Sequence, residues 1–194
     1  SLKGLPTRTT QFGRFDKGLA YTILMKYYMH EKNWAKAEEC GRELLKAEYG
    51  YGLMDRYADI FTLENEGNKE IIFACTEERG TNLQLWHDHA LPGNYPTKNA
   101  SIQKWDGYKV PWPFYRTFEE GDDRLSVLVG EYVGTDGVLF NEESDIAKHG
   151  NLYSGAVPVK YGEDPESTGD GSQIDLVVYL SLIHISEPTR RSYI

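Results

Sequence analysis

The first part of the chain carries a hydrophobic pattern with a helical period. Between Phe15 and His30, apolar residues recur at every fourth position in two overlapping series: Leu19, Ile23, Tyr27 and Ala20, Leu24, Tyr28. This spacing gathers them on one side and predicts an amphipathic helix over residues 15 to 30. Asp16 stands at its start, where a carboxylate complements the positive end of the helix dipole.

A second helical pattern follows a tight turn. Asn33 is a suitable N-cap for a helix over residues 34 to 48. Small residues on its inner side, Ala37 and Gly41, permit close approach of the first helix, and Gly50 ends the pattern. The sequence therefore predicts a helical hairpin over residues 14 to 48. Four positions have the spacing of a tetratricopeptide unit: Leu24, Tyr28, Ala37 and Leu44.

Beyond the hairpin, the periodic signals are short. Residues 71 to 74 form a continuous apolar run, Ile-Ile-Phe-Ala, which predicts a short buried strand. The weaker patterns predict a short helix or turn over residues 55–61, a helix over 114–119, strands over 125–132 and 156–161, and polar loops over 134–155 and 163–173.

Residues 76 to 113 hold no period for more than a few positions. Gly, Pro, Asn, Trp and His dominate this stretch. Long irregular loops are usually either functional or disordered, and the aromatic content here disfavours disorder. We therefore expect residues 76 to 113 to be a loop-rich binding region, with an ordered binding loop over residues 81 to 112.

Composition narrows the classes of partner. The net charge of −9 and the pI of about 5.1 argue against nucleic acid, which is bound by clustered Lys and Arg. The sequence contains no run of 18 apolar residues, so it predicts no membrane-spanning helix. Fourteen tyrosines and four tryptophans suit stacking on sugar rings, although most aromatic side chains fill protein cores. Cys40 and Cys75 are expected to be free and mostly buried thiols.

Motifs for catalysis, metals and cofactors are weak. Paired carboxylates could hydrolyse glycosides, and three pairs occur: Glu77-Glu78, Asp122-Asp123 and Glu142-Glu143. Each lies in a polar, turn-like context that favours solvated acids over a catalytic pair. His87-Asp88-His89 contains residue types that bind metals, but three consecutive residues rarely face one ion. No Gly-x-Ser-x-Gly motif, P-loop or dinucleotide fingerprint is present. Taken together, these observations lead us to expect no enzyme activity, no metal and no cofactor.

Five segments follow the hairpin in this order: Tyr51-Gly52-Leu53, Tyr57-Ala58-Asp59-Ile60-Phe61, Lys69-Glu70-Ile71-Ile72-Phe73, Phe114 to Arg124, and Val159-Lys160-Tyr161. Their order after a helical hairpin resembles the SusD/RagB family of outer-membrane nutrient-uptake lipoproteins, and Asp175 to Tyr179 resembles the start of the next family segment. The resemblance covers about residues 14 to 180. It implies a mainly α, SusD-like fold with a tetratricopeptide-type hairpin, short strands and long ordered loops, within one partial domain over residues 1 to 180.

The resemblance also implies a role and a place in the cell. A non-catalytic component would capture oligosaccharide or polysaccharide, or another nutrient such as peptide, at the outer-membrane surface. It would pass the ligand to a TonB-dependent transporter. The family's secretory signal and lipid-bearing cysteine do not occur in this chain, so membrane association is expected only through an anchor absent from it. Residues 181 to 194 depart from the family pattern and are expected to be a foreign tail.

The candidate binding residues all lie in the irregular region. Three rings are the expected sugar platform, Trp86, Trp105 and Tyr108, and three polar side chains are the expected hydrogen-bonding groups, Asn82, His87 and Asp88. Gln84 and Asp106 are further polar neighbours, and Trp112 is a fourth candidate ring. The alternative for Trp105 and Trp112 is that both pack the loop on the core. The alternative function is a tetratricopeptide-like protein-interaction module that uses the hairpin and binds no sugar.

Overall fold

The computed structural model describes residues 2 to 181, which divide into two compact units. The first unit comprises residues 2 to 55, 67 to 76 and 176 to 181, and the second comprises residues 56 to 66 and 77 to 175. Apart from Ser181, the expected foreign tail lies outside the described residues. Within that range, no helix has the length and apolar character that crossing a membrane requires.

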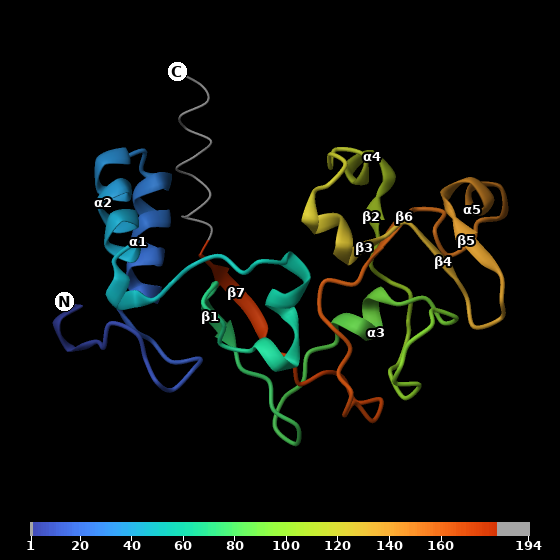
Figure 1. Ribbon diagram of the computed structural model, residues 1–194, viewed down its shortest axis with the longest axis horizontal. Helices are drawn as coiled ribbons and strands as arrows, with labels where there is room; N and C mark the ends of the chain where they lie inside the picture. The colour runs from blue at the N-terminus through green and yellow to red at the C-terminus, as the bar shows by residue number, and fades with distance from the viewer. Residues whose placement is uncertain (1, 182–194) are drawn as a thin grey trace. The chain divides into compact units, whose positions relative to one another are not determined.

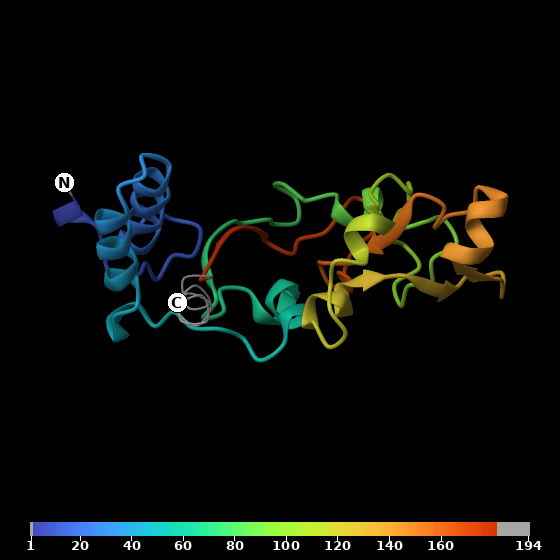
Figure 2. The same cartoon turned by 90° about the horizontal axis from the view of Figure 1, so that it is seen from above.

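The predicted hairpin is confirmed in the first unit. Helices α1 (Lys17–His30) and α2 (Trp34–Leu44) lie side by side in both Figure 1 and Figure 2. Asp16 caps α1 by accepting a hydrogen bond from the backbone N–H of Leu19 at 2.9 Å. Asn33 caps α2 in the same way, accepting from Lys36 at 3.3 Å.

Helix α2 ends four residues earlier than the sequence predicts. Its C-cap is Leu45, and Lys46 adopts an extended backbone with a ψ of 141°. A 3-10 turn, Ala47–Tyr49, follows and ends at Gly50, whose φ of 63° is left-handed. Glycine adopts that conformation without the steric cost that a side chain brings. Gly50 therefore ends the 3-10 turn, and not α2 as the sequence predicted.

The predicted strand is also confirmed. Strand β1 (Ile71–Cys75) pairs antiparallel with β7 (Leu176–Leu180), with Ile71 opposite Leu180 and Cys75 opposite Leu176 (Figure 1). Ile71, Ile72 and Ala74 are buried. The expectation of two buried thiols holds for Cys40 and is wrong for Cys75, which stands exposed at the end of β1.

The second unit is built on short strands. A three-stranded antiparallel sheet has the order β2 (Val110–Pro111), β6 (Gly155–Pro158), β3 (Leu128–Val129). Strands β4 (Glu131–Val133) and β5 (Leu139–Asn141) form a separate hairpin. Helix α5 (Glu142–Lys148) follows β5 directly and lies beside it in Figure 2. All four residues of β6 are buried, so this central strand anchors the unit.

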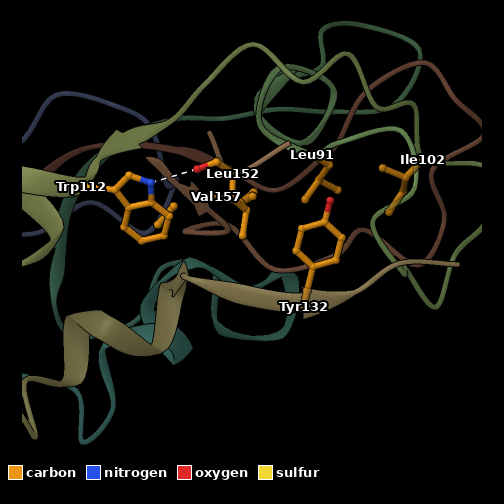
Figure 3. Close-up of a cluster of buried hydrophobic side chains, with 7 residues drawn as sticks. Leu91, Ile102, Trp112, Tyr132, Leu152 and Val157 are labelled. Carbon is orange, nitrogen blue, oxygen red and sulfur yellow. Dashed lines mark hydrogen bonds between the residues drawn. The ribbon is translucent and has the colours of Figure 1, made fainter. Parts of the chain in front are cut away.

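The core of this unit gathers side chains from distant segments (Figure 3). Leu91, Ile102, Tyr132 and Leu152 are buried together with Trp112, whose indole N–H donates to the carbonyl of Leu152 at 2.9 Å. Of the two roles left open for Trp112, the core role is therefore the one the structure supports.

Several element boundaries in the second unit differ from the predictions. The helix expected over 114–119 is α4 (Trp112–Tyr115), and the strand expected over 125–132 is a 3-10 helix, Asp123–Val127, followed by β3 and β4. The strand expected over 156–161 ends at Pro158, which cannot donate to a strand ladder. The loop expected over 134–155 contains β5 and α5, because Asn141 caps a helix by accepting from Ser144.

The expectation of a mainly α fold holds for only one part of the chain. The described residues hold five α-helices and seven strands, and only α1 and α2 exceed seven residues. The helical label therefore suits the hairpin of the first unit. The second unit is organised by short strands, 3-10 turns and ordered loops.

Candidate functional site

The candidate site is built on α3 (Trp86–Ala90), a helix of five residues in the second unit. The last carbonyls of a helix have no partner within it, and here the following loop supplies the donors. The backbone N–H of Trp105 donates to the carbonyl of Asp88 at 2.5 Å, and those of Gly107 and Tyr108 donate to the carbonyl of His89 at 2.6 Å each. These bonds fasten residues 105 to 108 to the end of α3.

This attachment brings four rings together, and we call Trp86, His89, Trp105 and Tyr108 the aromatic cluster. His89 and Tyr108 are stacked, with centroids 5.0 Å apart and an interplanar angle of 27°. Trp105 meets His89 edge-on at 5.0 Å and 82°. Trp86 packs against Tyr108 at 5.5 Å. Contacts of these kinds are favourable between aromatic rings and fix their relative orientation.

The rings of the cluster differ in their exposure. Trp105 is 51% exposed and Tyr108 is 44% exposed, whereas Trp86 is partly buried. The indole N–H of Trp86 donates to the carbonyl of Pro158 at 2.8 Å, and its ring packs edge-on against buried Tyr161 at 5.5 Å. Trp86 therefore anchors the cluster in the unit, and Trp105 and Tyr108 face the solvent.

Two polar candidates, His87 and Asp88, lie on α3 itself but are buried. His87 and Asp88 are only 4% and 3% exposed, and His87 Nε2 lies 3.2 Å from the carbonyl oxygen of Tyr161. Burial raises the pKa of the Asp88 carboxyl above its ordinary value. As placed, neither side chain reaches a ligand at the surface, because both point into the unit. Their burial favours a supporting role beneath the exposed rings over direct contact with sugar.

Two further polar candidates have partners within the loop region. Asn82 is exposed, lies in the turn that pairs Glu78 with Asn82, and donates its amide to Glu77 at 2.7 Å. Gln84 is buried, and its side-chain oxygen accepts the backbone N–H of Trp86 at 2.7 Å. Gln84 therefore helps to orient α3.

Charged groups next to the exposed rings are largely engaged. Asp106 pairs with Lys109. Lys104 donates to the carbonyl of Tyr95 at 2.7 Å, and burial lowers the pKa of this ammonium group. Within residues 2 to 181, no three His, Cys, Asp or Glu side chains gather in a way that could hold a metal ion.

Comparison with known proteins identifies the fold. No family model and no curated protein matches the sequence. Among solved structures, surface glycan-binding protein A from Bacteroides thetaiotaomicron matches with a TM-score of 0.71 at 17% identity, over 98% of this chain and 47% of that one. A SusD superfamily protein from Parabacteroides distasonis matches with a TM-score of 0.67 at 15% identity, over 92% and 40%. The chain has a SusD-type fold.

The resemblance expected from the five sequence segments is thereby confirmed at the level of fold. The Bacteroides thetaiotaomicron protein in complex with laminarihexaose also matches, with a TM-score of 0.70 at 18% identity, over 97% of this chain and 46% of that one. The chain spans less than half the length of these solved structures. Because a fold can host different functions, the use of the site is argued from its residues.

Sequence reasoning missed His89, which lies between the two exposed rings of the aromatic cluster in this SusD-type fold. A usable signal was present, because residues three apart on a helix share a face. Trp86 and His89 have that spacing on α3, and both pack on Tyr108. Tyr161, which supports Trp86 from within the unit, carried no such local signal because it lies in a distant segment.

The paired carboxylates considered for catalysis have structural partners. Asp122 caps the following turn and pairs with Arg124, which lowers the pKa of its carboxyl to about 2. Glu142 pairs with Arg116, and Glu77 accepts the amide of Asn82. In each pair, one carboxylate therefore has a structural interaction that explains its presence without a catalytic role.

Proposed function

We propose that this SusD-type chain binds oligosaccharide or polysaccharide through the aromatic cluster and does not chemically alter it. The observation that carries the proposal is the pair of solvent-facing rings, Trp105 and Tyr108, held on the end of α3 by backbone hydrogen bonds. A flat ring can stack on the apolar face of a pyranose, and two exposed rings held side by side offer such a face at a fixed place.

The structural neighbours support the same use of the fold. Two of them are structures of one surface glycan-binding protein, and the second is in complex with laminarihexaose. Another, with 19% identity and a TM-score of 0.67, was solved with a xylogluco-oligosaccharide. In this chain, capture would begin with stacking on Trp105 and Tyr108. Because the rings are already ordered by α3, binding costs little additional side-chain entropy.

The proposal extends to the cellular role that the SusD-like sequence segments imply. The glycan-binding component would stand at the outer-membrane surface and pass its ligand to a TonB-dependent transporter. Capture without conversion fits the site, because hydrolysis requires two carboxyl groups flanking the scissile bond. In the aromatic cluster the neighbouring carboxylate of Asp106 is paired with Lys109, and that of Asp88 is buried.

A protein-interaction module is the second candidate, and one observation favours it. The hairpin of the first unit exposes large apolar side chains, including Ile23 and Tyr27 on α1 and Trp34 at the start of α2. A partner protein that stays bound after the aromatic cluster is removed, with no glycan bound by the unaltered chain, would favour this function.

Affinity electrophoresis in gels containing glycans tests the first proposal. Trp105→Ala should lower the apparent affinity calculated from the retardation by about tenfold or more, as expected for loss of a central aromatic anchor. Trp34→Ala is the matched control, because Trp34 is 57% exposed but belongs to the hairpin. Equal retardation of the unaltered chain and Trp105→Ala would place binding elsewhere, and no retardation of either would count against glycan binding.

A further inference from the structure

The two exposed rings of the aromatic cluster face different directions. Trp105 is almost perpendicular to His89, at 82°, whereas Tyr108 is close to parallel with it, at 27°. Two rings with these angles to one shared neighbour cannot be coplanar. Trp105 and Tyr108 therefore form a corner, with the imidazole of His89 between them.

The corner is held rigidly. Backbone hydrogen bonds tie Trp105 to Asp88, and Tyr108 to His89, at either side of the turn. Gly107 lies so close to the helix end that a Cβ atom there would stand 3.2 Å from the carbonyl oxygen of His89. The indole N–H of Trp105 also donates to the side-chain oxygen of Gln103 at 3.0 Å. The backbone bonds fix where each ring is attached, and turning the Trp105 ring toward the plane of Tyr108 would break its hydrogen bond to Gln103 and its edge-on contact with His89.

Glycan chains differ in how successive sugar faces are oriented. A β-1,4-linked glucan or mannan is an extended ribbon whose sugar faces lie nearly parallel, so it suits rings that share one plane. An α-1,4- or β-1,3-linked glucan turns along its length, so neighbouring sugars present faces at an angle. We propose that the corner formed by Trp105 and Tyr108 selects glycan chains that turn over flat ribbons. This inference rests on the proposed glycan binding and names its ligand class.

Charge indicates that the selected chain is neutral. The two lysines that flank the corner are both engaged, Lys109 with Asp106 and Lys104 with the carbonyl of Tyr95. The whole chain carries a net charge of −9, which repels polyanionic glycans. A chain of unsubstituted hexoses therefore fits the corner better than one rich in uronic acid or sulfate.

Isothermal titration with four neutral hexasaccharides tests the inference on the full chain. The turning pair is maltohexaose and laminarihexaose, and the ribbon pair is cellohexaose and mannohexaose. We expect at least one turning ligand to bind about tenfold more tightly than both ribbons, which is the scale on which single pocket contacts discriminate. A ratio of about threefold is the smallest that would support the inference. A smaller ratio, or a preference for a ribbon, would overturn the inference while leaving glycan binding intact.

The wild-type result also separates the two proposals. If the chain binds none of the four hexasaccharides and no gel-immobilised glycan, the proposed function itself fails, and the linkage preference fails with it. If it binds ribbons and turning chains alike, only the linkage preference fails.

Variants of His89 test whether the corner causes the preference. His89→Ala removes the ring that separates Trp105 from Tyr108, so the ratio of affinities should fall to below about threefold. His89→Phe keeps an aromatic ring of similar shape at that place and should preserve the preference. A preference that survives in His89→Ala, with both variants folded by circular dichroism, would show that the corner is not its source.

Discussion

Tyrosine plays three different roles in this chain, and the residue type alone does not distinguish them. Tyr108 presents its ring to solvent in the aromatic cluster. The hydroxyl of Tyr132 donates to Asn94 at 2.9 Å and accepts from Asn151 at 2.7 Å. The hydroxyl of Tyr51 is buried without a hydrogen-bond partner in the described part of the chain. Burial raises the pKa of both Tyr51 and Tyr132 to about 12.

Removing the two buried hydroxyls should therefore have opposite consequences. Tyr51→Phe should leave the free energy of unfolding unchanged or increase it, because the lost group is desolvated and unpaired. Tyr132→Phe should lower it by about 1 kcal/mol, because two hydrogen bonds to asparagine side chains are lost. Urea unfolding of both variants measures the difference. A cost for Tyr51→Phe as large as that for Tyr132→Phe would show that the Tyr51 hydroxyl has a partner.

The limits of sequence reasoning are clearest for single rings. The sequence placed Trp105 and Trp112 in one irregular segment, which is where both lie. It could not separate them, although Trp105 faces solvent and Trp112 is buried. The difference depends on Leu152, 40 residues further along, whose carbonyl accepts the indole N–H of Trp112. Exposure set by such a distant partner leaves no local pattern.

At the scale of elements, prediction succeeded where many residues share one period. The α1–α2 hairpin and strand β1 were found because their apolar residues repeat or run together. Strands β2 and β3 have two residues each, too few for any period, and were missed or displaced. The segment 163–173 was expected to be a surface loop on its polar composition, yet Asp164 in it has an exposed fraction of 0%.

That segment is ordered by an ion pair whose carboxylate, Asp164, is fully buried and whose arginine, Arg79, is partly buried. The Asp164 carboxylate accepts the guanidinium of Arg79 at 2.8 Å and the backbone N–H groups of Glu166 and Gln173 at 2.9 Å each. Arg79 lies 85 residues earlier, so composition alone gave no hint of the pairing. The same guanidinium also contacts exposed Asp170 at 2.8 Å.

Two carboxylates that share one arginine offer a matched comparison. Asp164→Ala should lower the free energy of unfolding by about 3 kcal/mol or more, because it leaves Arg79 and two backbone donors without their buried acceptor. Asp170→Ala removes the exposed half of the same interaction and should cost less than about 1 kcal/mol. Chemical denaturation followed by tryptophan fluorescence reports the result. Similar losses in both variants would contradict the assignment of the buried pair as the organising contact.

At the scale of the whole molecule, buried acids set a pH dependence. Asp175 donates its backbone N–H to the carboxylate of Glu66 at 3.1 Å. Burial raises the pKa of the Glu66 carboxyl, and the nearby charge of Asp175 raises it further. Burial also raises the pKa of Asp175. The folded second unit therefore binds protons at these groups more readily than the unfolded chain does.

The sign of the effect follows from that difference. Stability supplied by the protonated acids is complete at acid pH and is lost as the pH rises through their raised pKa values. The net charge of −9 acts in the same direction through self-repulsion. We therefore expect the urea midpoint of the second unit to fall as the pH rises from mildly acidic to neutral. Tryptophan fluorescence reports it, because three of the four tryptophans, Trp86, Trp105 and Trp112, lie in that unit.

Variants assign the slope to particular groups. Glu66→Gln keeps an acceptor for Asp175 but cannot ionise, so it should reduce the pH dependence and raise the midpoint at neutral pH. Asp122→Asn is the control, because Arg124 holds the pKa of that carboxyl at about 2 and it stays ionised throughout the range. A slope unchanged in Glu66→Gln, or removed in Asp122→Asn, would place the titrating groups elsewhere.

The pairing of β1 with β7 also has a consequence during synthesis. About 100 residues, nearly all of the second unit, separate the two strands in the sequence. At the usual rates of translation, β1 leaves the ribosome roughly 5 to 20 s before its partner exists. Throughout that interval the Ile71-Ile72-Phe73 edge has no strand to pair with, and unpaired apolar edges invite aggregation. In the cell, the yield of this protein is therefore expected to depend on how β1 is sheltered while the inserted unit is made.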